Sequence, residues 1–378
     1  MKGTCPKPIA DWLRLMVARK ASDLILTAGF PPAIKLDGKV TPLSKQTLTP
    51  TETLSMAHSV MTERIRAEFD AHKEANFAIH DLEIGRFRVS AFVQQGRVGV
   101  VFRLVNTRIP RLEELHLPPI LQDIAMMPRG LVLVVGATGS GKSTTLAAMI
   151  GHRNQTVQEH IITVEDPIEY VHQHGRSIIT QREVGSDTES WEVALKNTLR
   201  QAPDVIMLGE IRDVEAMEYA LAYAETGHLC LSTVHANNAN QTMDRILSFF
   251  PRERRDQVLL DLAMHLRAIV SQRLLPRLDG KGRIPAVEVL LNSPLIADMI
   301  KEGRIFEIKD IMAKSRDLGM QTFDQSLFDL FKAGVVSAED ALRNADSFND
   351  LRLKIKLHRE GRDDGQPSAA AISHLDII

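Results

Sequence analysis

Residues 131–143 read Leu-Val-Leu-Val-Val-Gly-Ala-Thr-Gly-Ser-Gly-Lys-Ser. Five apolar residues precede the pattern G-x-x-x-x-G-K-[ST], and residues 144–150 follow as Thr-Thr-Leu-Ala-Ala-Met-Ile. Strand, glycine-rich loop and helix in this order are the context that a phosphate-binding loop requires. Glycines let successive backbone N–H groups converge on phosphate oxygens, and the start of a helix adds a partial positive charge. The stretch therefore predicts a nucleoside triphosphate site.

The residues of this loop have separate expected roles. Lys142 can reach the β- and γ-phosphates, and the Ser143 hydroxyl can bind Mg²⁺. A glycine-rich turn before a helix is the alternative interpretation, which the flanking strand and helix disfavour. We expect ATP, bound with Mg²⁺, to contact Gly136, Thr138, Gly139, Ser140, Gly141, Lys142, Ser143 and Thr144.

The composition is that of an ordinary globular protein. Of 378 residues, 44% are apolar and 25% are charged, and the formal net charge is −2. A chain of this length is expected to form two or three domains. Because there is no basic excess, we do not expect nucleic acid as a main partner.

Cysteine content and hydropathy bear on the compartment. Cys5 and Cys230 are far apart, so neither a disulfide framework nor a C-x₂-C zinc site is expected, which fits a reducing cytosol. Residues 1–10 contain two prolines and no long apolar run, unlike a signal peptide. No run approaches the roughly 18 apolar residues of a membrane span. We expect a cytoplasmic protein that acts at a membrane only through protein partners.

The first hundred residues predict a small α/β module. Asp37-Gly38 is a strong hairpin signal, and apolar residues at helical spacing predict a helix over 51–75. Strict alternation on both sides of Gln95-Gly96 predicts an antiparallel hairpin with one buried face. The expected strands are residues 24–26, 33–36, 87–93 and 98–102.

From Leu131 on, apolar segments alternate with helical stretches, which is typical of a parallel α/β sheet. Each segment is followed by polar residues. In such sheets ligands bind outside the carboxyl ends of the strands, so these residues are expected to share one site. The four segments are residues 131–135, 160–164, 204–208 and 228–234.

Beyond Arg252 the chain is expected to be mainly helical. Apolar residues at helical spacing predict a helix over 256–275 that packs against a core. Ser337 to Asp340 resemble a capping box at the start of a further helix. The composition of residues 361–378 is typical of a mobile tail.

Two acidic residues follow predicted strands. Glu210, in Gly209-Glu-Ile-Arg-Asp213, stands where a Walker B carboxylate orders Mg²⁺ directly or through water. Glu165 follows residues 160–164, where a carboxylate can position or deprotonate the water that attacks the γ-phosphate. The alternatives are a solvated strand end for Glu210 and a helix cap or turn for Glu165.

His228 and His235 flank the fourth strand, seven residues apart. Positions seven apart face opposite sides of a strand, so one metal cannot easily join them. Both are catalytic candidates: we expect one to sense the γ-phosphate and the other to support the sheet or a subunit contact. Two structural histidines are the alternative.

Four arginines lie on the N-terminal hairpin. Exposed arginines on a strand usually form a solvated face. In a ring-shaped ATPase, some of them could instead reach the nucleotide of a neighbouring subunit. They are Arg86, Arg88, Arg97 and Arg103.

Taken together, these segments resemble the secretion ATPases of type II secretion and type IV pili. Four of them resemble, in chain order, the Walker A, Asp, Walker B and His boxes of that family. Ala21-Ser-Asp-Leu24 with Gly29-Phe-Pro-Pro32, and Gly85-Arg-Phe-Arg-Val89, resemble the N-terminal domain of the PilT retraction ATPases. The resemblance covers about residues 5–335. The four boxes are residues 136–143, 162–169, 209–213 and 227–235.

The resemblance implies a hexameric ring with nucleotide at the subunit boundaries. It also implies that Glu165 is the catalytic glutamate and Glu210 the Walker B acid. The remaining matches are His228 and His235 to the His box, and Arg88 and Arg103 to nucleotide-contacting arginines.

The family architecture gives the expected division of this α/β chain. Pro110, Pro118 and Pro119 mark the linker between the two main domains. The expected parts are a PAS-like α/β domain (1–106), the linker (107–119), a RecA-like phosphate-loop ATPase core (120–290), a helical C-terminal region (291–360) and the tail (361–378).

One segment departs from the PilT pattern. PilT proteins carry Ala-Ile-Arg-Asn-Leu-Ile-Arg-Glu, which retraction needs, whereas residues 295–302 read Leu-Ile-Ala-Asp-Met-Ile-Lys-Glu. Residues 319–325 and 341–346, and a C-terminus longer than that of PilT, resemble the PilU branch of the PilT/PilU family, the accessory retraction ATPases.

The resemblance therefore implies an ATPase motor that powers type IV pilus retraction and twitching motility, together with PilT and the inner-membrane pilus platform protein. An extension or type II secretion ATPase is one alternative, although those commonly carry a paired-cysteine zinc site. A conjugation-type DNA-transfer ATPase is disfavoured by the near-neutral charge. A regulator in which ATP only orders a scaffold is the third alternative.

Overall fold

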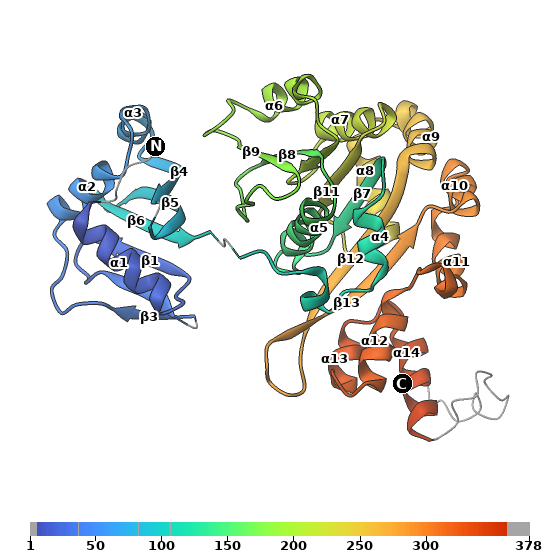
Figure 1. The fold of residues 1–378 in the computed structure, drawn as a ribbon. Coiled ribbons are helices and arrows are strands. Elements are labelled where there is room, and N and C mark those ends of the chain that lie inside the picture. Colours follow the sequence, from blue (N-terminus) through green and yellow to red (C-terminus); the bar gives the residue numbers. More distant parts are fainter. Residues whose placement is uncertain (1–5, 37, 82, 106–107, 361–378) are drawn as a thin grey trace. The chain divides into compact units, whose positions relative to one another are not determined.

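Figure 1 shows the computed structural model, which describes residues 6–36, 38–81, 83–105 and 108–360. Two β-sheets are accompanied by helices, which confirms the α/β class. The chain divides into two compact units. The first comprises Met1–Arg111, Ala125–Arg129 and Ser143–Ser232, and the second Leu112–Ile124, Gly130–Lys142 and Thr233–Ile378.

An antiparallel sheet of six strands forms first, in the order β3-β2-β1-β6-β5-β4. The predicted hairpin is confirmed, because Gln94 pairs with Arg97 at the turn between β5 and β6. Val89 and Phe102 pair across this hairpin and are buried in the core. The elements are α1 (Lys7–Ala18), β1 (Asp23–Thr27), β2 (Ala33–Leu36), β3 (Lys39–Pro42), α2 (Pro50–Ser59), α3 (Glu63–His72), β4 (Glu74–Asp81), β5 (Gly85–Gln94) and β6 (Arg97–Leu104).

The single helix predicted over residues 51–75 is wrong. The chain leaves the helix after Ser59 and starts a new one at Glu63. Thr62 causes the restart, because its backbone is extended and its side-chain oxygen accepts the N–H of Ile65 as a helix cap. The apolar spacing continues across this break and conceals it in the sequence.

The second sheet has seven strands, in the order β13-β12-β7-β11-β10-β8-β9. Strands β11, β10, β8 and β9 are parallel, β12 is parallel to β7, and β13 is antiparallel to β12. All four predicted apolar segments are confirmed as strands of this sheet. Its strands are β7 (Gly130–Val135), β8 (His160–Glu165), β9 (Ile178–Glu183), β10 (Val205–Leu208), β11 (Leu229–Val234), β12 (Leu266–Pro276) and β13 (Arg283–Leu291).

Helices lie between most of these strands in the sequence, as is typical of an α/β sheet, whereas β9 follows β8 and β13 follows β12 with no helix between them. The helix predicted after the phosphate loop is confirmed as α5. The helices up to β12 are α4 (Ile120–Ala125), α5 (Lys142–Thr156), α6 (Trp191–Thr198), α7 (Val214–Glu225), α8 (Ala239–Phe249) and α9 (Arg255–His265).

The helix predicted over residues 256–275 is wrong from Leu266 onward, where β12 begins. Ile269 and Val270 are adjacent in this strand and both fully buried. A strand covered on both faces buries neighbouring residues, so its apolar spacing can match that of a helix. The expectation of a mainly helical chain beyond Arg252 also missed β13.

After β13 the described chain is helical, and Figure 1 shows α12, α13 and α14 packed side by side. Ser337 caps α13 as predicted, since its hydroxyl accepts the Asp340 N–H at 2.9 Å. Cys5 and the tail predicted at 361–378 lie outside the described residues. The helices are α10 (Pro294–Lys301), α11 (Ile308–Lys314), α12 (Phe323–Lys332), α13 (Ala338–Arg343) and α14 (Phe348–Arg359). Within the described ranges, no helix has the length and hydropathy to cross a membrane.

Strand β13 carries a buried carboxyl group. Glu288 is 2% exposed and accepts hydrogen bonds from the Ala239 N–H at 2.7 Å and the Ser271 hydroxyl at 3.2 Å. Burial raises the pKa of Glu288 from 4.5 to about 7. The folded chain therefore keeps this proton to a higher pH than the unfolded chain. The protonated Glu288 therefore contributes to the free energy of unfolding at low pH, and this contribution is lost as pH rises from 4.5 to about 7.

We expect Glu288→Gln to stabilise the protein more at pH 8 than at pH 5. Glutamine keeps the shape of the protonated carboxyl and cannot ionise, so its advantage should grow by about 3 kcal/mol between these pH values. Chemical denaturation at both values measures this difference. The exposed Glu225→Gln serves as control, and an equal effect of Glu288→Gln at both pH values would contradict the expectation.

Candidate functional site

The phosphate loop lies between β7 and α5. Gly136 has a φ of +150°, and a Cβ atom there would lie 2.4 Å from the Ser140 Oγ and 2.5 Å from the Gln272 carbonyl oxygen. No side chain fits at those distances, so the position requires glycine. Lys142 directs its Nζ back to the loop and donates to the carbonyls of Gly136 at 2.8 Å and Ala137 at 3.0 Å. The loop is thus a tight turn closed by its own lysine.

Other groups of the loop suit a phosphate ligand. Thr138, Gly139 and Ser143 are exposed. The Oγ of Ser140 is buried and makes no hydrogen bond within the described part of the chain. Leaving a buried hydroxyl unpaired is unfavourable, and a phosphate oxygen would supply the missing partner. The loop residues chosen from sequence therefore form a site of the right chemistry for an anion.

Gln272 is a neighbour of the loop that sequence reasoning missed. It lies on β12, is 4% exposed, and would have its Nε2 2.8 Å from a Cβ at Gly141. Its main chain and side chain thus both limit the path of the loop. Because this segment resembles a helix in sequence, no local signal indicated its place.

Glu165 ends β8 and is 6% exposed. The Thr163 hydroxyl donates to its Oε1 at 2.7 Å, and the Gln181 amide donates to the same oxygen at 3.2 Å. Burial raises the pKa of this carboxyl. A carboxylate with a raised pKa is a better proton acceptor near neutral pH, so Glu165 has the environment of a general base.

The end of β10 lies against the end of β8. The Gly209 N–H donates to the Val164 carbonyl at 2.8 Å, and a Cβ at Gly209 would lie 3.3 Å from the Glu165 Cα. The next residue, Glu210, forms an ion pair with Arg212. The structure therefore brings together Glu165 and the turn that carries Glu210.

The oxygen groups at these positions fit magnesium. Protein sites hold Mg²⁺ through one or two side-chain oxygens, with phosphate and water as the other ligands. The Ser143 hydroxyl and the Glu210 carboxylate are groups of this kind. Thr144, the next residue of α5, has its Oγ1 2.8 Å from the Tyr170 hydroxyl. Among the residues described, no cluster of three or more His, Cys, Asp or Glu side chains is placed to hold a metal ion.

Strand β11 separates the two candidate histidines. His235 follows its carboxyl end and is exposed, whereas His228 precedes its first residue. The Nδ1 of His228 lies 3.0 Å from the Thr226 hydroxyl and 3.3 Å from the Tyr223 carbonyl. Ligands of such sheets bind at the carboxyl ends of strands, which is the end that His235 occupies. The structure therefore does not bring the two histidines together.

The two candidate arginines form ion pairs with carboxylates of the same chain. Arg88 lies 2.7 Å from Glu169, and Arg103 lies 2.7 Å from Asp23. Arg88 is on β5, and Arg103 is directly opposite it on β6. The antiparallel hairpin thus places the two guanidinium-bearing residues as a cross-strand pair.

Comparisons with known proteins agree on one family. The model for type II/IV secretion system proteins matches residues 35–321. The chain is 58% identical to the type IV pilus ATPase PilU of Pseudomonas aeruginosa, over 97% of this chain and 96% of that protein. It is 39% identical to the type IV pilus retractation ATPase PilT of the same organism, over 89% and 98%. A crystal structure of the pilus retraction motor PilT with bound ADP has a TM-score of 0.86 at 41% identity, covering 91% of this chain and 98% of that one.

We expect Gly136→Ala to weaken nucleotide binding about tenfold or more. The added methyl group would displace the loop or the Gln272 carbonyl, and overpacking of this kind costs about 1–3 kcal/mol. Titration with a fluorescent ATP analogue measures the affinity. Gly334→Ala is the control, because its φ of +69° is also positive and no atom lies within 4 Å of the added Cβ. Unchanged affinity in Gly136→Ala would refute the role given to the loop.

Proposed function

The chain belongs to the PilT/PilU family of type II/IV secretion system proteins, and from that premise we propose that it hydrolyses ATP to power type IV pilus retraction. The buried Glu165 beside the turn of Glu210, in a chain with a complete phosphate loop, carries the proposal. The similar PilU and PilT of Pseudomonas aeruginosa are type IV pilus ATPases, and the similar PilT structure contains ADP.

ATP is proposed to bind with its phosphates on the loop of residues 136–143. The N–H groups of the loop and the start of α5 stabilise the phosphate charge. Lys142 would exchange its two carbonyl contacts for phosphate oxygens, and the Ser140 hydroxyl would gain its missing partner. Ser143 and Glu210 would hold Mg²⁺, which when bound neutralises charge on the phosphate oxygens.

Glu165 is proposed as the general base. It accepts a proton from water while the water oxygen bonds to the γ-phosphorus, and the bond to the bridging oxygen breaks to give ADP and phosphate. Thr163 and Gln181 fix the orientation of the carboxyl through Oε1. His235 is proposed to sense the γ-phosphate, and His228 to support the sheet or a subunit contact.

The assembly is proposed to be a homo-hexamer with nucleotide at the subunit boundaries. Arg88 and Arg103 are then candidates to contact that nucleotide. The proposed parts of each subunit are a PAS-like domain (1–106), a linker (107–119), a RecA-like core (120–290) and a helical region (291–360).

Within the family, an accessory role alongside PilT is the best supported. Identity is 58% with a PilU and 39% with a PilT of one organism. Helix α10 carries most of the segment 295–302 that departs from the PilT motif, and Leu295 at its start is 52% exposed. The altered positions Leu295 and Lys301 are exposed, which suits a difference in partner contacts, whereas the altered Met299 is buried. The proposed partners are PilT and the inner-membrane platform protein, which would bring the protein to the cytoplasmic side of that membrane.

We expect Glu165→Gln to bind ATP and to lose about 100-fold or more of its turnover. The amide cannot accept the proton of the attacking water, while the phosphate loop is unaltered. Affinity and steady-state hydrolysis are measured on one preparation, with the exposed Glu192→Gln as control. Full turnover in Glu165→Gln would contradict its role as base. Lost turnover with normal twitching in cells would instead favour a scaffold that ATP merely orders.

Deletion of this gene in cells that keep PilT should impair pilus retraction. The proposed motor adds its force to that of PilT, so the defect is expected to be greatest under high load. Surface pili, twitching and single-pilus pulling at low and high load measure it. The wild-type gene should restore retraction and Lys142→Ala should not. Normal retraction at both loads would exclude the motor role.

A further inference from the structure

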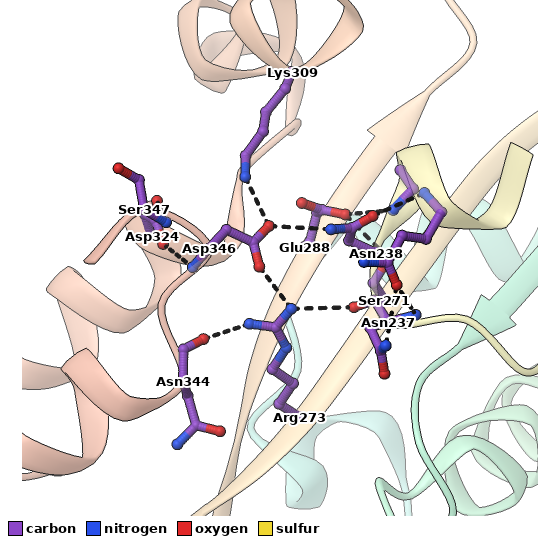
Figure 2. A network of polar contacts seen from close by, with 12 residues as sticks. Asn237, Asn238, Ser271, Arg273, Glu288, Lys309, Asp324, Asn344, Asp346 and Ser347 are labelled. Atoms are coloured by element: carbon purple, nitrogen blue, oxygen red, sulfur yellow. Dashed lines mark hydrogen bonds and ion pairs between the residues drawn. The ribbon is translucent and has the colours of Figure 1, made fainter. Parts of the chain in front are cut away.

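Asp346 lies at the centre of a polar network shown in Figure 2. It belongs to the loop between α13 and α14, and its side chain is 8% exposed. Arg273 on β12 donates to it at 2.6 Å, Lys309 on α11 at 2.7 Å, and the side chain of Asn238 at 3.4 Å. One carboxylate therefore joins three segments that are far apart in the sequence.

Arg273 extends this network to the main chain. Its guanidinium donates to the carbonyls of Asn344 and Asn237, the latter at 3.3 Å, and lies 3.9 Å from the centre of the Phe323 ring. A guanidinium presents five N–H groups in one plane, so a single arginine can fix several acceptors. Arg273 thus ties the loop before α14 to the main chain at Asn237.

The residues held in this way lie two and three positions after His235. Arg273 holds the carbonyl of Asn237, and Asp346 accepts from the side chain of Asn238. Asn238 also caps α8, because its Oδ1 accepts the Gln241 N–H at 2.9 Å. The path of the chain after His235 therefore depends on Arg273 and Asp346.

Asp346 is itself fixed by the C-terminal helical region. The N–H groups of Asp346 and Ser347 donate to the two carboxylate oxygens of Asp324, at 2.8 and 3.0 Å. Asp324 is 7% exposed and lies in the first turn of α12. Lys309 ties the carboxylate of Asp346 to α11, which packs against α10. The network is a physical link between these helices and the residues after His235.

Two cations depend on this one carboxylate. The side chains of Arg273 and Lys309 are 21% and 32% exposed, so both are partly removed from water. Without the negative charge of Asp346, the two cations would repel each other in a partly buried place. The expected response is that Arg273 moves, and it cannot move without releasing Asn237.

We propose that Asp346 is a positioning residue for ATP hydrolysis, which through Arg273 and Asn238 keeps the residues after His235 in the arrangement that turnover needs. The inference rests on the proposed function, in which His235 senses the γ-phosphate. The contacts of Asp346 described above all lie outside the phosphate loop. Its loss should therefore lower the rate of hydrolysis and leave the binding of ATP intact.

The test is a comparison of Asp346→Asn and Arg273→Lys in the full-length protein. Asparagine keeps the size and removes the charge, whereas lysine keeps the charge and removes the planar set of donors. Both should lower kcat about tenfold with KM for ATP unchanged within about twofold, because small displacements at a site reduce rates by such factors. Asp346→Glu should recover part of the lost rate. Hydrogen exchange should become faster in residues 235–242 and stay unchanged in residues 136–150.

The matched control is Glu339→Gln. Glu339 forms an exposed ion pair with Arg343 at 2.7 Å on α13, and Arg343 lines the same open polar cavity of about 500 Å³ as Asp346. This control should leave kcat, KM and exchange unchanged. Wild-type kcat in both test variants would overturn the inference, and so would faster exchange along the whole chain. If the native protein does not hydrolyse ATP, the proposed function itself fails. That result is obtained without the variants, so it is distinct from a failure of the inference about Asp346.

Discussion

The close approach of β12 to the phosphate loop is the constraint on which the site depends. The carbonyl of Gln272 fills the space that a side chain at position 136 would need, and its amide does the same at Gly141. The loop is therefore limited to one path, and Lys142 completes it through two carbonyls. Gly136 and Gly141 are thus required by a contact with a strand more than a hundred residues away in the sequence.

Much of the candidate site could be predicted because its signals are local. A polar residue directly after a buried strand marks the carboxyl edge of a parallel sheet, and this rule selected Glu165 and Glu210. Thr163 could also have been found, because positions two apart in a strand share a face and Thr163 lies two residues before Glu165 on β8. Gln181 could not, because β9 reads Ile-Ile-Thr-Gln-Arg-Glu, and only its pairing with β8 gives that glutamine its role.

The errors in the fold have the same origin. Residues 51–75 keep helical spacing across the cap at Thr62, and residues 256–275 keep it across the change from α9 to β12. The spacing of apolar residues indicates which residues are buried, but it does not determine whether the backbone is helical or extended. Where a strand is covered on both faces, its apolar spacing fits a helix or a strand, and only pairing with neighbouring strands decides between them. The polar network around Asp346 was likewise not evident from the sequence, because its members come from five separate segments.

The arrangement at Asp346 also limits how this protein can diverge. One carboxylate neutralises both Arg273 and Lys309, and the main-chain N–H of the same residue is fixed by Asp324. A substitution at any one of these positions leaves charge behind at the others. Lineages that lose Asp346 are therefore expected to change its two cations as well. The three positions are thus expected to change together in evolution, although Arg273 and Asp346 are 73 positions apart in the sequence.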